Sequence, residues 1–135
     1  MGYHSFDLQT IVYTTLNNDS TLDGLVGNNK IFDNVPQDTA YPYVVINNES
    51  AINRGTQTLD GNQYTIDLEV WSQYRGKKEI KEIMERIYNL FNNATYSVSG
   101  ASMVLSQIRN VITLVESDGI TRHGVLTLDV IVYDS

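Results

Sequence analysis

The period of the apolar residues changes within Tyr64–Phe91, and this change constrains the fold more than any other feature of the chain. Apolar and polar residues alternate from Tyr64 to Val70, as expected for a strand with one buried face. After Gly76 the apolar residues recur at steps of three and four, which predicts an amphipathic helix. These helical positions are Ile80, Ile83, Met84, Ile87 and Phe91. A strand that leads directly into a helix predicts a mixed α and β domain in which the helix lies on a sheet. We therefore expect Ile83, Ile87, Leu68 and Leu126 to meet in one core.

The same two periods, together with turn residues, predict the other elements. Ser5 is the expected N-cap of the first helix, and Ser20 the expected cap of a short turn. Asp118–Gly119 is a hairpin turn signal. The predicted elements in chain order are a helix over 6–17, a turn over 21–26, strands over 31–35, 43–49 and 64–71, a helix over 77–91, and strands over 103–116 and 124–133. Hairpin links favour a mainly antiparallel sheet. The predicted fold is an α+β domain over 1–135, with a single sheet and two helices packed on one face.

The segment Asn47–Asn62 is polar, contains two glycines and follows neither period. It is either a long hairpin arm or a mobile loop, and its length favours an interaction loop. The expected contact residues are Asn53, Arg54, Gly55, Thr56, Gln57, Thr58 and Leu59.

Composition excludes several classes of protein. The chain has 135 residues, no cysteine and a formal net charge of −7. Without cysteine there are no disulfides, iron–sulfur clusters or thiolate zinc sites. The nine Lys and Arg residues are scattered, which disfavours sequence-wide DNA binding. An acidic surface repels DNA and suits a surface past which DNA slides. The sequence shows neither a signal peptide nor an apolar stretch long enough to span a membrane, so we expect no membrane contact.

No residues form a recognisable catalytic, cofactor or metal site. His4 and His123 are far apart in sequence, and we interpret His123 as a turn or surface residue. The nucleophile-elbow and phosphate-loop motifs are absent. Asp67, Glu69 and Asp129 lie on the polar face of predicted strands, where solvation is a better explanation than catalysis.

Large apolar residues also lie on this polar face. Trp71 lies on the side of Asp67 and Glu69, and Ile131 and Tyr133 lie on the side of Asp129. Either a partner contacts this face, or a second helix or the N-terminal segment covers it.

Three segments carry a family resemblance through their order and spacing. They are LQTIVYTTLNNDSTLDGLVGNNKIFDNVPQDTAYPYVVI, YTIDLEVWSQYRGKKEIKEIMERI and DGITRHGVLTLDVIVYD. Together they resemble the tail completion and tail terminator proteins of long-tailed bacteriophages and gene transfer agents, the gp17-like family. The resemblance spans about 8–133, and each motif is a packing or turn pattern. The loops of this chain are rich in Asn and Tyr, so loop contacts cannot be transferred from the family.

The resemblance implies a structural virion protein and not an enzyme. Proteins of this kind form a hexameric ring at the head-proximal end of the tail tube, where they end tube growth and join the head. The implied partners are further copies of the chain, the tail tube protein and a head-completion or neck protein. Genomic DNA would pass through without specific binding. The strand alternation and the acidic balance of the chain predict that some of Asp67, Glu69 and Asp129 face the central channel or a subunit seam, and the alternative is that they face bulk solvent on the outside of the ring. The implied location is the virion, with assembly in the host cytoplasm. The alternatives are a neck, head-completion or tube subunit, and a small acidic binding domain of a cellular protein.

Overall fold

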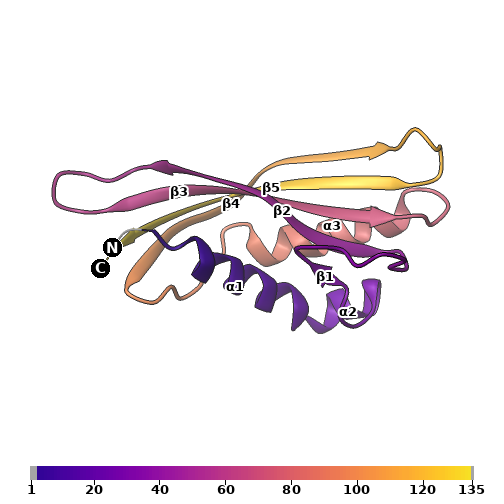
Figure 1. Cartoon of the computed structure of the whole chain (residues 1–135), viewed down its shortest axis with the longest axis horizontal. Coiled ribbons are helices and arrows are strands. Elements are labelled where there is room, and N and C mark those ends of the chain that lie inside the picture. Colours follow the sequence, from indigo (N-terminus) through magenta and orange to yellow (C-terminus); the bar gives the residue numbers. More distant parts are fainter. Residues whose placement is uncertain (1–2, 135) are drawn as a thin grey trace.

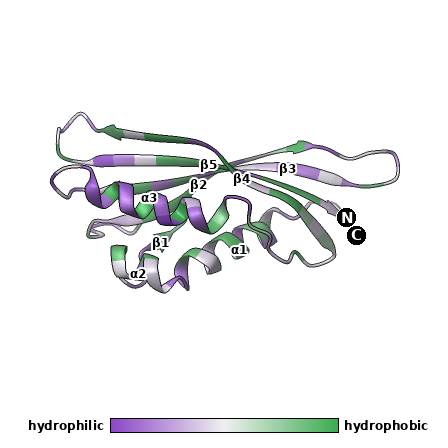
Figure 2. Cartoon of the chain, turned by 180° about the vertical axis from the view of Figure 1, so that it is seen from behind, coloured by the Kyte–Doolittle hydropathy of each residue, from purple (hydrophilic) through white to green (hydrophobic). Residues whose placement is uncertain are grey.

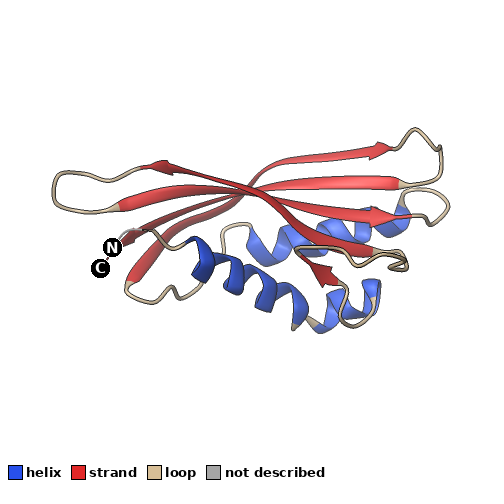
Figure 3. Cartoon of the chain, in the orientation of Figure 1, coloured by secondary structure: helices blue, strands red, loops and turns tan. Residues whose placement is uncertain are grey.

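The computed structural model describes residues 3–134, which form three helices and five strands (Figure 3). The elements are α1 (Ser5–Asn17), α2 (Ser20–Val26), β1 (Ile31–Phe32), β2 (Tyr43–Asn53), β3 (Gly61–Ser72), α3 (Lys78–Phe91), β4 (Ala101–Val115) and β5 (Arg122–Asp134). The strands form one sheet in the order β1-β2-β3-β5-β4. Only β1 and β2 are parallel, and the other neighbours are antiparallel. This arrangement confirms the predicted α+β fold with a mainly antiparallel sheet.

The prediction of a turn over 21–26 is wrong, because this segment forms α2, the third helix. Its N-cap is Asp19 and not Ser20. The Asp19 carboxylate accepts the Leu22 N–H at 2.8 Å and satisfies one of the free donors at the helix start. A short helix therefore forms where the apolar pattern was too brief to indicate one.

The start of α1 is also held differently from the prediction. Ser5 lies inside the helix, and its hydroxyl donates to Glu49 Oε2 at 2.6 Å. His4 occupies the cap position without a side-chain cap bond. Its Nε2 lies 2.7 Å from Asp134 Oδ1, and its backbone N–H donates to the Tyr64 hydroxyl at 2.7 Å. Contacts with the sheet thus fix this end of the helix.

All three helices lie on one face of the sheet and leave the other face uncovered by helices (Figure 1; Figure 2 gives the view from behind). In β3 the even-numbered residues from Tyr64 to Val70 point toward the helices and are buried, while the intervening residues are half-buried. Leu68, Ile83, Ile87 and Leu126 are 0% exposed and belong to one core cluster, as predicted. The matching of the strand and helix periods therefore located the core correctly.

The prediction of a loop over Asn47–Asn62 is wrong in extent. Residues up to Asn53 belong to β2, and Gly61 begins β3, so 54–60 alone form the loop. The strands pair without a register break from Glu49 opposite Ile66 to Asn53 opposite Asn62. Main-chain hydrogen bonds make this pairing, and they do not require the apolar alternation that the sequence lacks here. The hairpin-arm alternative was the correct one.

Two hairpins extend beyond the helical layer at opposite ends of the sheet (Figure 1). The β2–β3 arm carries the 54–60 loop, and the β4–β5 arm carries the turn around Asp118 and Gly119. The ends of the chain lie together on the side of the β2–β3 arm. The molecule therefore offers separate contact regions at its two ends.

Candidate interaction surfaces

The sheet face without helices carries the three carboxylates singled out by the sequence. Asp67 and Glu69 alternate with buried residues of β3, and Thr65 of the same row pairs with Asp129 of β5. They share one face, as predicted. They are not free charges, however, because each one is hydrogen-bonded to a neighbouring side chain.

Asp129 is the most enclosed of the three, with 7% exposure. Its Oδ1 accepts the Thr65 hydroxyl at 2.8 Å, and its Oδ2 lies 3.1 Å from Nε of Arg109. The expectation of an ordinary solvated carboxylate is therefore wrong for this residue. Asp67 fits that expectation better, since its one hydrogen bond, from Thr127, is long at 3.3 Å.

His123 lies between two carboxylates on the same face. Its Nδ1 is 3.0 Å from Glu116 Oε2, and its Nε2 is 3.1 Å from Glu69 Oε1. A neutral imidazole donates from one nitrogen, so both contacts are hydrogen bonds at once only when the ring is protonated. Asn47 also donates to Glu69. The interpretation of His123 as a surface residue is wrong, because its side chain is 16% exposed and links β5 to Glu69 of β3 and to Glu116, which follows β4.

Trp71 stacks on the His123 ring, with centroids 3.7 Å apart and planes 12° apart. The sequence left open whether a partner contacts this face or whether a second helix or the N-terminal segment covers it. The helices lie on the opposite face, and within the chain the His123 ring covers one side of Trp71. Polar and aromatic groups are thus held rigidly on a surface that is available to another molecule.

The tip of the β2–β3 arm contains all seven expected contact residues, and each is exposed. Hydrogen bonds within the arm shape it. The Arg54 N–H donates to Gly61 O at 2.8 Å, and the Thr56 N–H donates to Leu59 O at 2.8 Å. The Asn53 side chain accepts the Gly55 N–H at 2.7 Å. The tip is therefore an ordered turn that presents polar groups and one large apolar side chain, Leu59.

Gly61 packs directly against the ring of Tyr133, its partner on β5. A Cβ at this position would lie 2.2 Å from Cδ1 of Tyr133, which no real contact allows. The Tyr133 ring therefore occupies the space over Gly61 at the base of the arm. A side chain at position 61 would have to displace this ring.

The far half of β4 is exposed on both faces. Val111, Ile112, Leu114 and Val115 are each between 38 and 47% exposed. Their β5 partners show the alternation: Val111 pairs with Leu126, which faces the helices, and Leu114 pairs with His123, which faces away. The sequence did not lead us to predict this exposed surface, because we interpreted 103–116 only as an apolar-rich strand. The signal is the failure of alternation in Val-Ile-Thr-Leu-Val, which makes both faces of the strand apolar.

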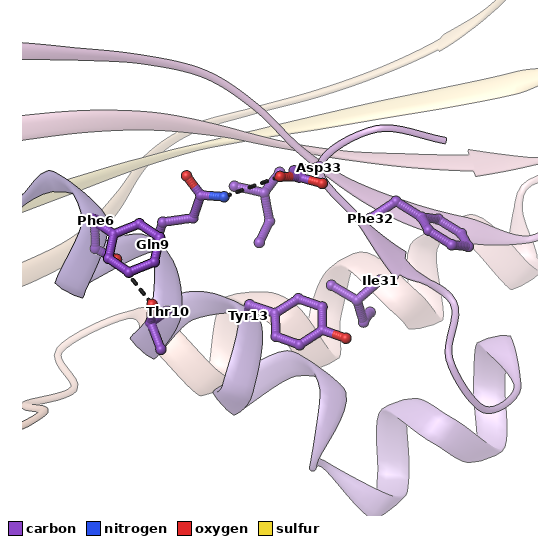
Figure 4. A pocket seen from close by; sticks show the side chains of 8 residues that line it. Phe6, Gln9, Thr10, Tyr13, Ile31, Phe32 and Asp33 are labelled. Carbon is purple, nitrogen blue, oxygen red and sulfur yellow. Dashed lines mark hydrogen bonds between the residues drawn. The ribbon is translucent and has the colours of Figure 1, made fainter. Parts of the chain in front are cut away.

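A groove of about 380 Å³ lies between α1 and the short β1 (Figure 4). Phe6 and Tyr13 of α1 line one side, and Ile31 and Phe32 line the other. Gln9 bridges it by donating to Asp33 Oδ2 at 3.3 Å. The groove exists because β1 has only two residues and so covers little of the β2 edge beside it.

The carboxyl groups with a lowered pKa have structural causes. The hydrogen bond from Arg86 lowers the pKa of Asp19, the backbone N–H of Thr121 lowers that of Asp118, and the hydrogen bond from His4 lowers that of Asp134. Within residues 3–134, no group of three or more His, Asp or Glu side chains could hold a metal ion. In the same residues, no helix is both long and apolar enough to cross a membrane.

The chain is similar to known proteins in sequence and in fold. The family described as Tail completion protein gp17 matches residues 10–133. A curated relative, the Tail completion protein gp17 of Bacillus phage SPP1, is 26% identical over 98 residues, which are 73% of this chain and 72% of that protein. A chain in the solved virion of a native gene transfer agent particle has the same fold, with a TM-score of 0.86 and 22% identity. That match covers 93% of this chain and 94% of the other.

Proposed function

The chain belongs to the tail completion protein gp17 family, and from this premise we propose that it closes the head-proximal end of a phage tail tube as a hexameric ring. In this role it is a structural virion protein without enzymatic activity, and residues 1–135 act as a single domain. The ring ends growth of the tube and forms the surface that joins the head. The observation that carries the proposal is the family match over 10–133, which spans both arms and the whole sheet.

The two arms offer the separate contact surfaces that a protein needs in order to join a tail tube to a head. The tip of the β2–β3 arm, Asn53–Leu59, is exposed and ordered, and we assign it to contact with the tail tube protein or a neighbouring subunit. The β4–β5 arm at the other end is available for a further contact. A head-completion or neck protein is the proposed partner on the head side.

The uncovered sheet face suits the lining of a channel. Of its carboxylates, Asp67 and Glu69 repel a DNA backbone, and the net charge of −7 acts in the same sense, whereas Asp129 is enclosed and paired with Arg109. The hydrogen bonds to Asp129 and Glu69 hold two of these groups in place. DNA would then pass without a specific contact.

The particles that form without this protein distinguish the terminator role from its alternatives. We expect particles that lack this chain to contain tubes of abnormal length and heads without tails, as seen by electron microscopy. Loss of a tube subunit would instead abolish tubes, and loss of a neck protein would leave tubes of normal length that do not join heads. Normal-length tubes joined to heads in the absence of this chain would refute the proposal.

A further inference from the structure

The His123 ring lies between two carboxylates that come from different parts of the chain. Glu69 belongs to β3 and lies 3.1 Å from Nε2 of the ring, and Glu116 follows the end of β4 and lies 3.0 Å from Nδ1. The side chains of His123 and Glu69 are 16% and 14% exposed, so water and salt screen their interaction weakly. We call Glu69, Glu116 and His123 the His123 cluster.

Trp71 is a further group that favours a positive charge on this ring. The indole and the imidazole are stacked, with centroids 3.7 Å apart and planes 12° apart. The face of an aromatic ring carries negative charge density and attracts a cation that lies over it. A protonated His123 therefore makes favourable contacts with both carboxylates and with the indole.

A neutral His123 ring cannot keep all of these contacts. It carries hydrogen on one nitrogen, and the other nitrogen presents a lone pair to the carboxylate oxygen beside it. Glu69 is held in place by a second hydrogen bond, which the Asn47 side chain donates. The Glu116 side chain is more exposed, at 36%. The repulsion is therefore relieved most easily when the Glu116 carboxylate moves toward solvent.

Glu116 also begins the turn at the end of the β4–β5 arm. Its backbone N–H donates to Thr121 O at 2.8 Å, and its carbonyl accepts the Gly119 N–H at 2.9 Å. The contact of its carboxylate with His123 thus fastens the turn to β5 and, through the ring, to β3. Gln73 makes a second link that does not depend on a proton, because its Nε2 donates to the Thr121 hydroxyl at 3.0 Å. When Glu116 moves away, the turn stays attached to the sheet through fewer bonds.

We propose that the His123 cluster is a proton-dependent latch for the end of the β4–β5 arm. With hydrogen on both ring nitrogens the latch is closed, and the cluster joins the turn to β3. When the ring gives one proton to solvent, the Glu116 side chain is released and the turn loosens. The latch would set how firmly this end of the arm is presented to a partner, and this consequence alone rests on the proposed function.

The other titratable groups at this end of the sheet keep their charge while a histidine titrates. Tyr43 of β2 pairs with Trp71, and burial raises the pKa of the Tyr43 phenol to about 12, so it stays neutral. In the turn, the backbone N–H of Thr121 lowers the pKa of Asp118, which therefore stays ionised. Arg122 carries a permanent positive charge. These groups provide a constant background for the ring.

The strands on either side of the ring add no further free charge next to it. On β4, Leu114 lies opposite His123, and Arg109 farther along the strand pairs with Asp129. On β3, Asp67 lies two residues before Glu69 and accepts a hydrogen bond from Thr127. Histidine is the side chain that ordinarily titrates between about pH 5 and 8, so a titration over this range reports on the ring.

Trp71 is the only tryptophan of the chain and provides a direct readout of this proton. A protonated imidazole quenches the fluorescence of an indole on which it stacks, so Trp71 emission should rise as the ring loses its proton. Emission is measured on the purified chain from about pH 5 to about pH 9. We expect the rise in the unchanged chain and in His4→Gln, which removes the other histidine. His123→Phe keeps an aromatic ring without a titrating proton and should give constant emission, and a rise in this variant would overturn the proposal.

The turn must respond to the same proton if the cluster is a latch. The backbone amide signals of 117–121, followed by NMR, should shift with the same midpoint as the Trp71 emission. Glu116→Gln is the matched variant, because a glutamine amide can either accept from a ring N–H or donate to the bare ring nitrogen. In this variant Trp71 should still respond to pH, whereas the amides of the turn should not.

The possible outcomes separate the latch from a simple effect of charge. Amides of the turn that ignore the titration in the unchanged chain would show that the turn is not coupled to the ring, which overturns the proposal. Amides that respond equally in Glu116→Gln would show that the ring acts through space and not through the Glu116 contact, which also overturns it. Both measurements use the purified chain, so a negative result would leave the proposed role in the tail unaffected.

Discussion

Asp19 joins two helices through a set of hydrogen bonds that the apolar pattern does not reveal. Its carboxylate accepts the Leu22 N–H at the start of α2 and binds Arg86 of α3 through Nε at 2.8 Å and Nη2 at 2.6 Å. The Asp19 side chain is largely buried. These bonds lower the pKa of Asp19 below its ordinary value of 3.8, and the hydrogen bond from Arg86 is the main cause.

We expect Asp19→Ala to lower the free energy of unfolding by roughly 1–3 kcal/mol, because it removes both the cap and the pair with Arg86. Asp19→Asn should cost less, since asparagine still accepts the Leu22 N–H. A carboxyl with a lowered folded pKa stabilises the protein fully above its unfolded pKa and loses this effect as the pH falls through the folded value. The gap between the unchanged chain and Asp19→Asn should therefore be widest above pH 5 and shrink below pH 4, as measured by urea unfolding. A gap independent of pH would contradict this assignment.

His123 shows why the contacts of single residues on the candidate surface could not be predicted from the sequence. Its partners Glu69 and Glu116 lie 54 and 7 positions away, and only the pairing of β3 with β5 and of β5 with β4 brings them together. Asp129 was placed on the correct face, but the register with Arg109 that encloses it depends on a bulge in β4. The alternation of apolar and polar residues predicts on which face of the sheet a strand residue lies. It does not predict which residue lies opposite on the neighbouring strand.

At the scale of elements, the prediction succeeded where apolar periodicity was strong. The strand around Leu68 and the helix around Ile83 were located because burial selects apolar residues at fixed steps. The helix α2 was missed, and for Asn47–Asn62 the hairpin arm remained one of two alternatives. Polar strands that pair through main-chain hydrogen bonds show almost no periodic pattern of apolar residues. The same holds for a helix of seven residues that is capped by Asp19.

The core contact between α3 and the sheet predicts a large effect of Ile87→Ala. Ile87 is fully buried, so the truncation should destabilise the chain by roughly 2–5 kcal/mol through lost burial and a cavity. Chemical denaturation of the monomer provides the measurement. Ile120→Ala is a suitable control, because Ile120 is 56% exposed and should change little. Equal stabilities of the two variants would refute the packing of α3 on the sheet.

The tip of the β2–β3 arm should affect assembly without affecting the fold. Deleting Gly55–Leu59 removes the exposed turn but leaves the paired strands and the core unchanged. We expect the purified variant to melt as the unchanged chain does, while its tails fail to join heads in electron micrographs. A full-length variant with Thr56, Gln57 and Thr58 all changed to Ala tests whether side chains or loop length matter. Normal joining with the deleted tip would exclude this loop from the contact.

At the scale of the whole molecule, the proposed channel lining predicts an effect on DNA rather than on assembly. Asp67 is the carboxylate with the weakest internal bond, so Asp67→Lys should be tolerated by the fold and should add a positive charge to each subunit. Particles should form in normal numbers but release DNA more slowly at low salt. The delay should fade at higher salt, because the Debye length falls to about 8 Å at physiological ionic strength.

Asp38→Lys is the control for this experiment, since Asp38 is exposed in the loop before β2 and not on the sheet face. It makes the same change of charge at a different place. The measurement is the rate of DNA release from purified particles at two salt concentrations. Equal rates for the two variants would show that Asp67 faces away from the DNA path.

The closeness of the two chain ends has a practical consequence for orienting the molecule in a particle. The His4 and Asp134 side chains are 2.7 Å apart, so a short linker could connect the ends beside the β2–β3 arm. Such circular permutation would allow new ends to be opened in the β4–β5 turn, at the far end of the sheet. A fluorescent or gold label on the original ends would then mark one pole of the assembly, and a label on the permuted ends would mark the other. Paired images of the two labelled proteins would give the direction in which the subunit stands between tail and head.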